Sequence, residues 1–457
     1  MTSTGTASST EESTGATVSC GSTRRGTGGD LGDLTVRCQT CKKMRGMQEA
    51  AEFENFALGR CQGTRPWLGL HGSREECTLP ARLLTRTASN AYFPQVMSAL
   101  SLPDQATGLD KVVGELWNEL MYVESAAELL FLKKRPTVAA KLAGYGEGDV
   151  LAAIERVRGG GVVERPVKQV ELDAILSAPE GFGDDVPVDP DFHARRLSDS
   201  HWRQSPLSSP IASVVQLHRL REVLALIGFT RFEAVTPDVD GEYDGDVERA
   251  NLALEPKWFP AVENRGEGIF LLLDPEAVAA WLTRPGVGRR LDRLREGHRM
   301  WADARKLERA FPGGPYVLLH TLSHLLLQSL AMRCGYPASS IRERIYVDPE
   351  GGRFGLLLYT ASPDAEGTLG GLVGQARNIE THLAVALRTG GLCSNDPVCA
   401  QHAPGEGLEG RHLHGAACHG CALISETSCE MRNDYLDRAL VVPTLAVDDA
   451  ALFASVP

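Results

Sequence analysis

Cysteines near the C-terminus have the spacing of metal ligands. Cys418 and Cys421 form a Cys-x-x-Cys pair, and Cys429 follows shortly after them. Two thiolates of such a turn can reach one Zn²⁺ ion, which structural sites bind through four Cys or His ligands in a tetrahedron. Cys393 and Cys399 lie just upstream, so five cysteines are available for four positions. We favour Cys399 as the fourth ligand, with Cys393 as its first substitute. Three nearby histidines are further alternatives: His412, His414 and His419.

A second group of cysteines lies near the N-terminus. Cys38 and Cys41 form another Cys-x-x-Cys pair, followed by Cys61 and Cys77. Four cysteines with one such pair predict a small zinc-ribbon-like module. For both groups the alternative is a set of buried, inert thiols. Clustered cysteines in a chain without a secretory signal favour metal binding over disulfides, so we expect two structural Zn²⁺ ions.

Four thiolates leave a zinc ion no open position for water. Such a site stabilises a fold and does not catalyse a reaction. The sequence also contains no Ser-His-Asp signature, no dinucleotide fingerprint and no Gly-Lys-Ser/Thr phosphate loop. We therefore expect a protein that is not an enzyme.

Two other motifs could bind ligands. His320 and His324 are four residues apart, so they share one face of a predicted helix and could bind a metal ion. Two buried histidines that hydrogen-bond within the core are the favoured alternative, because Leu and Val surround them. Gly370 and Gly371 belong to a glycine-rich loop whose amides could contact a phosphate, although a plain strand-to-helix turn is favoured.

A basic segment could contact nucleic acid. Residues 283–310 contain nine Arg or Lys and four acidic residues. The alternative, which we favour, is a solvated helical face with internal ion pairs. The candidate phosphate contacts are Arg289, Arg290, Arg293, Arg295 and Arg299.

The bulk composition limits the classes of protein. The formal net charge is −12, which argues against a protein that coats nucleic acid by itself. The first residues lack the apolar run of a signal peptide, and the longest apolar stretch is short for a membrane span and interrupted by histidines. We expect a cytoplasmic protein that does not enter the membrane.

The elements that position these residues mix helices and strands. The stretch YVLLHTLSHLLLQSLAMRCG predicts a helix that ends at Gly335, and Asp274 predicts a helix N-cap before Pro275. RIYVDPEGGRFGLLLYT predicts a hairpin. The fold class expected is α+β or mixed α/β, with an N-terminal zinc-ribbon-like module, a mixed middle region and a C-terminal α/β zinc-binding domain.

Composition divides the chain into seven parts. The first is a disordered tail rich in Ser, Thr and Gly, and a stretch rich in Pro, Ser, Asp and Gly predicts a linker or long loop. The expected parts are a tail (1–35), the N-terminal zinc module with its four cysteines (36–105), a helical region (106–178), the linker (179–210), a mixed region (211–310), the C-terminal zinc-binding domain (311–445) and a second tail (446–457).

The C-terminal third resembles a known family. The strings LLHTLSHLLLQSL, YTASPDAEGTLGGLVG, LCSNDPVC, GAACHGCALISETSCE and NDYLDRALVVPT are similar to the zinc-binding domain at the C-terminus of some bacterial DEAD/DEAH-type helicases. They resemble most its stand-alone form, the DrmB family of the DISARM anti-phage defence system. N-terminal CQTC, CQGTRPWLG, EEC and TRTASNAYFPQVMSALSLP are similar to the same family, although the chain is short for it.

The resemblance implies a role and a partner. Members of this family lack a helicase motor and pair with DrmA, a separate large helicase, in a complex that engages phage DNA. The resemblance assigns zinc binding to Cys393, Cys399, Cys418, Cys421 and Cys429. We therefore expect a non-catalytic, zinc-binding accessory subunit, with a metal-dependent nuclease or hydrolase, or a purely architectural scaffold, as alternatives.

Overall fold

The computed structural model describes part of the chain and divides it into two compact units. The described residues are 18–19, 35–38, 40–46, 60–61, 65–69, 92–102, 109, 112–158, 166–181, 191–230, 235, 237–241, 243, 249–305, 307–360, 371–404 and 412–453. Unit one comprises Met1–Pro94, Gly228–Ala234 and Ala250–Trp258. Unit two comprises Gln95–Ile227, Val235–Arg249 and Phe259–Pro457.

Unit one contains a small sheet in the order β1-β2-β3, with both pairs antiparallel. Its elements are β1 (Val18–Ser19), β2 (Thr35–Cys38), β3 (Met44–Gly46) and the 3-10 turn η2 (Pro66–Leu68). Trp67 in this turn donates its indole N–H to the carbonyl of Asn251 at 3.0 Å and packs edge-on against Phe229, with ring centroids 4.9 Å apart. These contacts join three segments of the chain into one unit.

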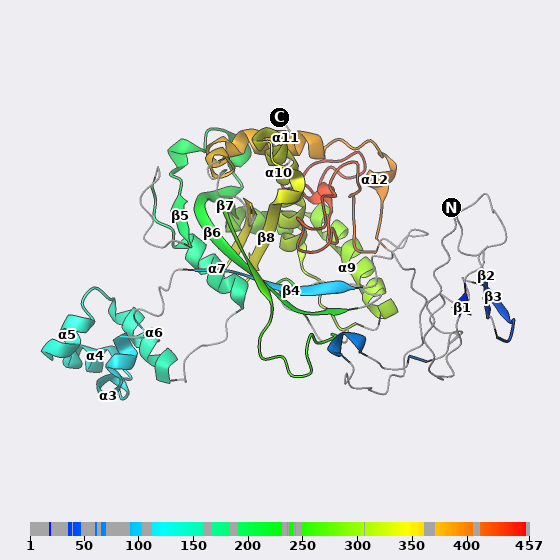
Figure 1. Cartoon of the computed structure of the whole chain (residues 1–457). Coiled ribbons are helices and arrows are strands. Elements are labelled where there is room, and N and C mark those ends of the chain that lie inside the picture. The colour runs from blue at the N-terminus through cyan, green and yellow to red at the C-terminus, as the bar shows by residue number, and fades with distance from the viewer. Residues whose placement is uncertain are drawn as a thin grey trace. The chain divides into compact units, whose positions relative to one another are not determined.

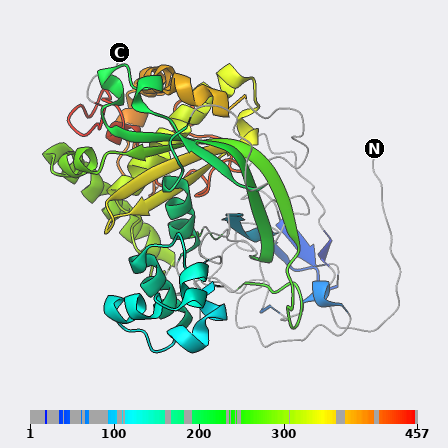
Figure 2. The ribbon, with the colours of Figure 1, turned by 90° about the vertical axis from the view of Figure 1, so that its left-hand side faces the viewer.

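Unit two is built on a six-stranded sheet in the order β4-β6-β7-β9-β8, with β5 paired to β6 (Figure 1). The pairs β5–β6, β6–β7, β7–β9 and β8–β9 are antiparallel. Figure 2 shows β6 and β7 as long, bent strands. The strands are β4 (Phe93–Leu100), β5 (His193–Arg196), β6 (Ile211–Thr230), β7 (Ala261–Leu273), β8 (Ile341–Asp348) and β9 (Arg353–Thr360).

Both faces of this sheet are covered. On β9, Leu356 and Leu358 belong to the larger core, whereas Leu357 and Tyr359 belong to a smaller core on the opposite face. This alternation follows from the two-residue period of a strand. Four helices contribute to the larger core: α8 (Pro275–Leu282), α9 (Pro285–Arg305), α10 (Gly314–Cys334) and α11 (Ile379–Gly390). Helix α7 (Val167–Leu176) covers the smaller one.

Short helices complete the unit. A helical module has its own core from Leu109 to Ile154. It consists of α3 (Trp117–Leu120), α4 (Ala126–Leu132), α5 (Pro136–Lys141) and α6 (Glu147–Arg158). The remaining elements are α12 (Val398–Gln401), η4 (Asp199–His201), η5 (Pro206–Ser208), η6 (Ala338–Ser340), η7 (Val373–Asn378) and η8 (Arg438–Leu440).

The local signals in the sequence produce the expected elements. The Asp274 carboxylate accepts hydrogen bonds from the first amides of α8, and Pro275 opens that helix. Helix α10 ends at Gly335, which has a left-handed backbone with φ of 72°. Strands β8 and β9 form the predicted hairpin. The α+β class is therefore confirmed.

Three expected boundaries differ from the structure. Within the expected linker 179–210, β5 pairs with β6, and Trp202 is buried in the larger core. Within the expected tail 446–457, Leu452 and Phe453 pack into the same core. The sheet also continues across residue 310, because β7 pairs with β9. Polar composition concealed these contacts, since single large apolar residues anchor otherwise polar segments.

Among the described residues, none of the helices combines the length and apolarity needed to cross a membrane.

Candidate metal centre

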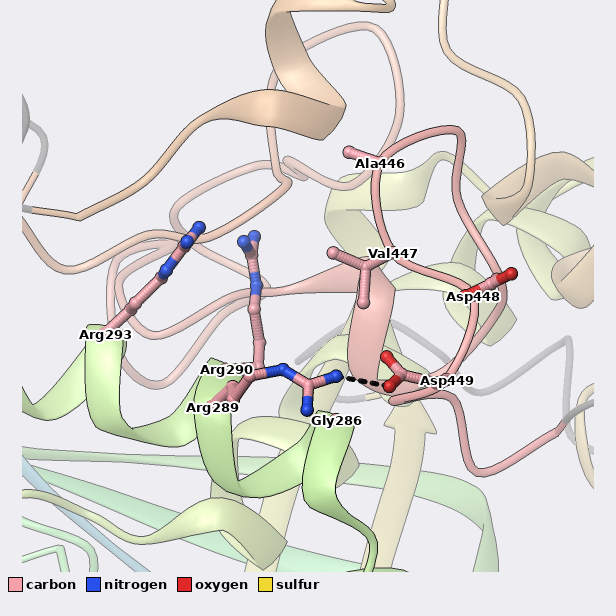
Figure 3. Close-up of a pocket in the computed structure, with 8 residues that line it drawn as sticks. All are labelled: Gly286, Arg289, Arg290, Arg293, Ala446, Val447, Asp448 and Asp449. Atoms are coloured by element: carbon pink, nitrogen blue, oxygen red, sulfur yellow. Dashed lines mark hydrogen bonds and ion pairs between the residues drawn. The ribbon is translucent and has the colours of Figure 1, made fainter.

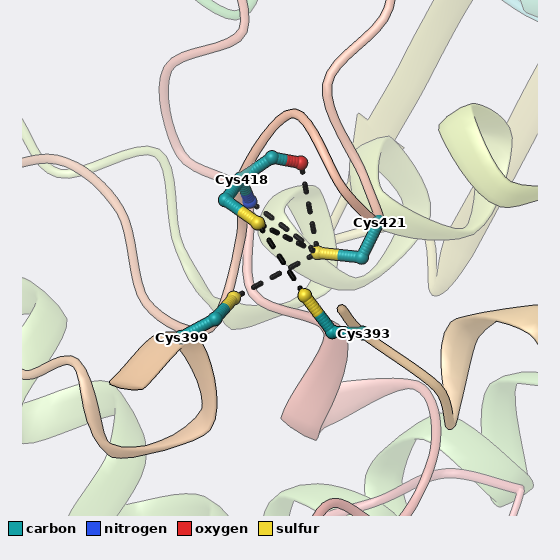
Figure 4. A group of neighbouring side chains, drawn as sticks. All are labelled: Cys393, Cys399, Cys418 and Cys421. Atoms are coloured by element: carbon teal, nitrogen blue, oxygen red, sulfur yellow. Dashed lines mark hydrogen bonds between the residues drawn. The ribbon is translucent and has the colours of Figure 1, made fainter. Parts of the chain in front are cut away.

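Four cysteine sulfurs converge in unit two (Figure 4). The Sγ of Cys418 lies 3.4 Å from that of Cys393 and 3.8 Å from that of Cys421, and the Sγ atoms of Cys399 and Cys421 are 3.8 Å apart. With Zn–S bonds of about 2.3 Å, the edge of a tetrahedral site is about 3.8 Å. The spacing therefore fits one zinc ion bound by four thiolates.

Each cysteine comes from a segment that is tied down locally. Cys393 follows the C-terminus of α11, and Cys399 lies in α12. Cys418 and Cys421 lie on one tight turn, in which the Cys421 amide donates to the Cys418 carbonyl at 3.0 Å. Leu436 packs against this group as part of a small separate core. The turn and the two upstream segments therefore point their sulfurs at a common centre.

Hydrogen bonds to sulfur stabilise the ionised form of Cys418. The amide of Gly420 donates to Cys418 Sγ at 3.3 Å, and the Asn395 side chain donates to the same sulfur at 3.3 Å. Although burial opposes ionisation, the Asn395 bond and neighbouring donors lower the pKa of Cys418 to about 7. A hydrogen bond with Cys421, together with burial, raises the pKa of Cys399. The ionised thiol is the form that binds metal.

Two buried arginines, each also paired with a carboxylate, lie near the four cysteines. The guanidinium groups of Arg290 and Arg438 interact electrostatically with the Cys399 sulfur. Arg438 is held by Asp396 at 2.5 Å and by the Gly390 carbonyl at 2.9 Å. Four thiolates and one Zn²⁺ carry a net charge of about −2, and these guanidinium groups divide their interaction between that charge and their own aspartates.

The sequence favoured Cys429 rather than Cys393 as a ligand of this zinc site, and the structure shows the reverse. Both Cys393 and Cys399 belong to the four-cysteine group, whereas Cys429 lies in another group with His320, His324 and Glu343. The cause is a closed loop, in which the Asn433 side chain bonds both the amide and the carbonyl of Ile424, at 2.9 and 3.0 Å. This loop turns Cys429 away from the Cys-x-x-Cys turn, a tertiary effect that spacing alone does not reveal.

His320 and His324 share one face of α10, as their spacing predicts, and both are fully buried. They lie beside Glu343, whose Oε1 is 3.0 Å from His320 Nε2 and 3.2 Å from His324 Nε2. The sequence-based search missed Glu343. Its signal is a carboxylate within the strand IRERIYVD, at a position that alternation directs toward the core.

The N-terminal group of cysteines is only partly described. Cys77 and the side chain of Cys38 lie outside the described residues. Cys41 and Cys61 are described and exposed. The N-terminal zinc module therefore stays a prediction.

The arginines of α9 differ in exposure and in their partners. Arg290 is 3% exposed and pairs with Asp437 through two guanidinium nitrogens, so it is not available to a phosphate. The predicted nucleic-acid contact of Arg290 is therefore corrected. Helical periodicity places Arg290 on the buried face of α9, one turn away from other buried residues of that helix. Arg289 is exposed and pairs with Asp449 beside a pocket that Arg290 and Arg293 also line (Figure 3).

Arg295 and Arg299 carry ion pairs within α9. Arg295 pairs with Asp292 at 2.6 Å, and Arg299 pairs with Glu296 and Asp303 at 2.6 and 3.0 Å. Arg293 is exposed and makes no ion pair with the described part of the chain. The face of α9 thus resembles the solvated, ion-paired alternative.

The glycine-rich loop is also only partly described. Gly370 lies outside the described residues, and Gly371 is exposed at the loop's end. The next amide, that of Leu372, donates to the buried Glu267 carboxylate at 2.7 Å. A protein carboxylate therefore occupies the place that a phosphate would need at this amide.

Two segments match known families. Residues 322–422 match the MrfA Zn-binding domain, which includes all four cysteines of the converging group. Residues 8–93 match a domain of unknown function, DUF8724, which spans the N-terminal cysteines. The C-terminal match supports zinc as the ion of the four-cysteine centre.

A curated relative matches almost the whole chain. It is the DISARM protein DrmB of Bacillus paralicheniformis, 31% identical in an alignment 456 residues long; the alignment covers 91% of this chain and 73% of the relative. The match therefore covers more than two thirds of both chains at over 30% identity. The chain therefore belongs to the DrmB family.

Proposed function

We propose that this chain is a non-catalytic, zinc-binding accessory subunit of a helicase or translocase complex that engages phage DNA in bacterial antiviral defence. The observation that carries the proposal is the 31% identity to a DISARM protein DrmB along 91% of the chain. The helicase partner is of the DrmA kind, and the complex works in the cytoplasm, where phage DNA arrives and thiols stay reduced.

The chemistry of the metal centre supports a structural role. Four cysteines fill every position around a zinc ion, which leaves no site for an activated water. The His320 and His324 side chains are fully buried, so a substrate has no direct access to them. Both features favour an accessory subunit over a metal-dependent nuclease or hydrolase.

The charge distribution supports contact with DNA through a partner. The chain has a formal net charge of −12, and the exposed Arg289, Arg295 and Arg299 have acidic neighbours. DNA affinity depends on local excess of positive charge. We therefore assign most DNA contacts in the complex to the helicase.

The test is reconstitution with the helicase. We expect the purified chain to show no ATPase or nuclease activity by itself. It should co-elute with the helicase subunit and change the DNA-stimulated ATPase rate of the helicase. Cys418→Ser should weaken co-elution, and Cys334→Ser, which alters a cysteine outside the four-cysteine group, is the control. ATP hydrolysis or DNA cleavage by the chain alone would sink the proposal. Co-elution without any effect on the helicase would favour an architectural scaffold instead.

A further inference from the structure

A second group of metal-binding side chains lies in unit two. His320 and His324 come from α10, Glu343 from β8 and Cys429 from the C-terminal loop. One donor atom of each lies within 4.8 Å of the others, and His320 Nε2 is 3.1 Å from Cys429 Sγ. Tetrahedral zinc sites with N, O and S ligands have edges of about 3.3 to 3.8 Å, slightly longer than this contact, so a small outward shift lets these atoms surround one ion.

The orientation of His324 argues for an ion between these groups. Its Nδ1 is 2.8 Å from the carbonyl oxygen of Ala422, which can only accept a hydrogen bond, so Nδ1 carries the proton. In the neutral ring, Nε2 then presents a lone pair to the Glu343 carboxylate at 3.2 Å. Two acceptors at this distance repel each other, whereas a cation between them binds both.

Two main-chain amides point at the sulfur of Cys429. The amides of Met431 and Asn433 donate to its Sγ at 3.3 and 3.1 Å. The same pattern of amides directed at sulfur occurs in the four-cysteine centre, at Cys418. Main-chain donors stabilise an anionic sulfur, which is the form that a metal ion requires.

Glu343 has supporting contacts of the kind that orient a metal ligand. Its Oε2 accepts from the Ser323 hydroxyl, and its Oε1 accepts from the Glu430 amide at 3.3 Å. The Ser323 hydroxyl thereby fixes Oε2, while Oε1 faces both histidines. Hydrogen bonds from surrounding groups commonly fix carboxylate ligands in this way.

Charge balance favours a divalent ion. One carboxylate and one thiolate carry two negative charges, and two neutral imidazoles add none. A divalent cation makes this group neutral, which matters because all four side chains are buried. Without an ion, one imidazolium beside the Glu343 carboxylate would also be neutral, but only a bound cation satisfies Glu343, both histidines and Cys429 together.

We propose that His320, His324, Glu343 and Cys429 form a second, closed zinc site that joins helix α10, strand β8 and the C-terminal loop. It is distinct from the four-cysteine centre, with which it shares no ligand. Two of its ligands, His320 and Cys429, lie outside the segment that matches the MrfA Zn-binding domain. The full burial of both histidines gives the ion a structural role.

The first test is the zinc content of the full-length, tag-free protein and its variants. We expect Cys429→Ser to lose about one zinc per chain, Cys418→Ser to lose another, and the double variant to lose two. His324→Gln should match Cys429→Ser. His382→Gln, which changes a buried histidine outside the group, should keep the wild-type content. Wild-type zinc content in both Cys429→Ser and His324→Gln would overturn the proposal.

The second test needs no variant, so it stands even where a buried substitution prevents folding. X-ray absorption at the zinc edge of the wild-type protein should show nitrogen or oxygen ligands at about 2.0 to 2.1 Å beside sulfur ligands at about 2.3 Å. The outer-shell scattering of imidazole should accompany them. A purely sulfur shell would overturn the proposal, because the four-cysteine groups contain no nitrogen or oxygen ligand.

Discussion

The tight turn around Cys418 directs hydrogen-bond donors at its sulfur, the atom that carries the negative charge of a thiolate. Its sulfur accepts hydrogen bonds from the Gly420 amide and the Asn395 side chain, and three further sulfurs face it. Without a cation, such a concentration of thiolates is repulsive, so metal binding and folding are coupled. The stability of this part of unit two should therefore depend on zinc.

Replacing one thiolate should release the ion. We expect Cys418→Ser to lose about one zinc and several kcal/mol of unfolding free energy, because zinc contributes roughly 10–16 kcal/mol in zinc-finger peptides. Elemental analysis and denaturant unfolding measure the two effects. The control is Cys334→Ser, half-buried and outside both metal groups. Unchanged zinc content in Cys418→Ser would contradict a four-thiolate site.

His382 should make stability depend on pH. It lies between the Ser329 hydroxyl and the Gln375 side chain, each at 3.1 Å. Burial, reinforced by the charge of Arg333, lowers its pKa to about 4. The folded state therefore binds fewer protons than the unfolded state between pH 4 and about 6.5, so unfolding free energy falls as pH drops through this range, by at most about 3 kcal/mol.

The measurement compares the unfolding free energy of His382→Gln and wild type at pH 7 and pH 5. The variant should lose less stability on acidification, and protonation of the cysteines affects both proteins alike. His201→Gln, at an exposed histidine, is the control and should behave as wild type. Equal losses in His382→Gln and wild type would show that His382 does not titrate in this range.

At the scale of elements, a buried ion pair fastens α7 to the sheet. Arg344 on β8 donates to the Glu171 carboxylate of α7 at 2.6 and 2.9 Å. The Arg344 guanidinium also donates to Ser98 on β4, at 2.9 Å to its hydroxyl and 3.0 Å to its carbonyl. Three elements therefore meet at one guanidinium group, whose polar atoms have partners in the interior.

Removing the carboxylate should leave a buried charge unpaired. We expect Glu171→Ala to lower the unfolding free energy by about 3–5 kcal/mol, as for other broken buried pairs. Asp292→Ala is the matched control, because Asp292 and Arg295 form an exposed pair, whose loss should cost less than about 1 kcal/mol. Denaturant unfolding measures both. Similar losses in the two variants would show that burial does not decide the strength of the Glu171 pair.

At the scale of the whole molecule, the sequence predicts helices, hairpins and turns, which depend on neighbouring residues. It does not predict contacts between segments that are distant in the chain. The helix ending at Gly335, the hairpin after Ile341 and the turn at Cys418 follow from neighbouring residues. The partners of Cys429 do not, because they come from a helix and a strand that are distant in the sequence. Burial of Trp202 likewise depends on a core that distant segments build.

The same limit applies to the basic helix α9. The excess of Arg in the sequence left a phosphate surface open beside the favoured ion-paired face, and the sequence did not show that Arg290 is buried against Asp437 or that Asp449 lies at Arg289. Asp292 pairs with Arg295 within the helix. The exposed face therefore has less free positive charge than its composition indicates.

Because of this compensation, we expect α9 to contribute little to DNA binding in the assembled complex. Replacing Arg289, Arg293 and Arg295 together with Gln should leave the slope of log affinity against log salt unchanged, since each lost phosphate contact reduces that slope by about 0.9. The matched control replaces three exposed basic residues of the helical module with Gln: Lys134, Arg135 and Lys141. Fluorescence anisotropy titrations at several salt concentrations give the slopes. A shallower slope confined to the α9 variant would contradict the expectation and would assign direct phosphate contacts to this subunit, because both variants lose the same total charge.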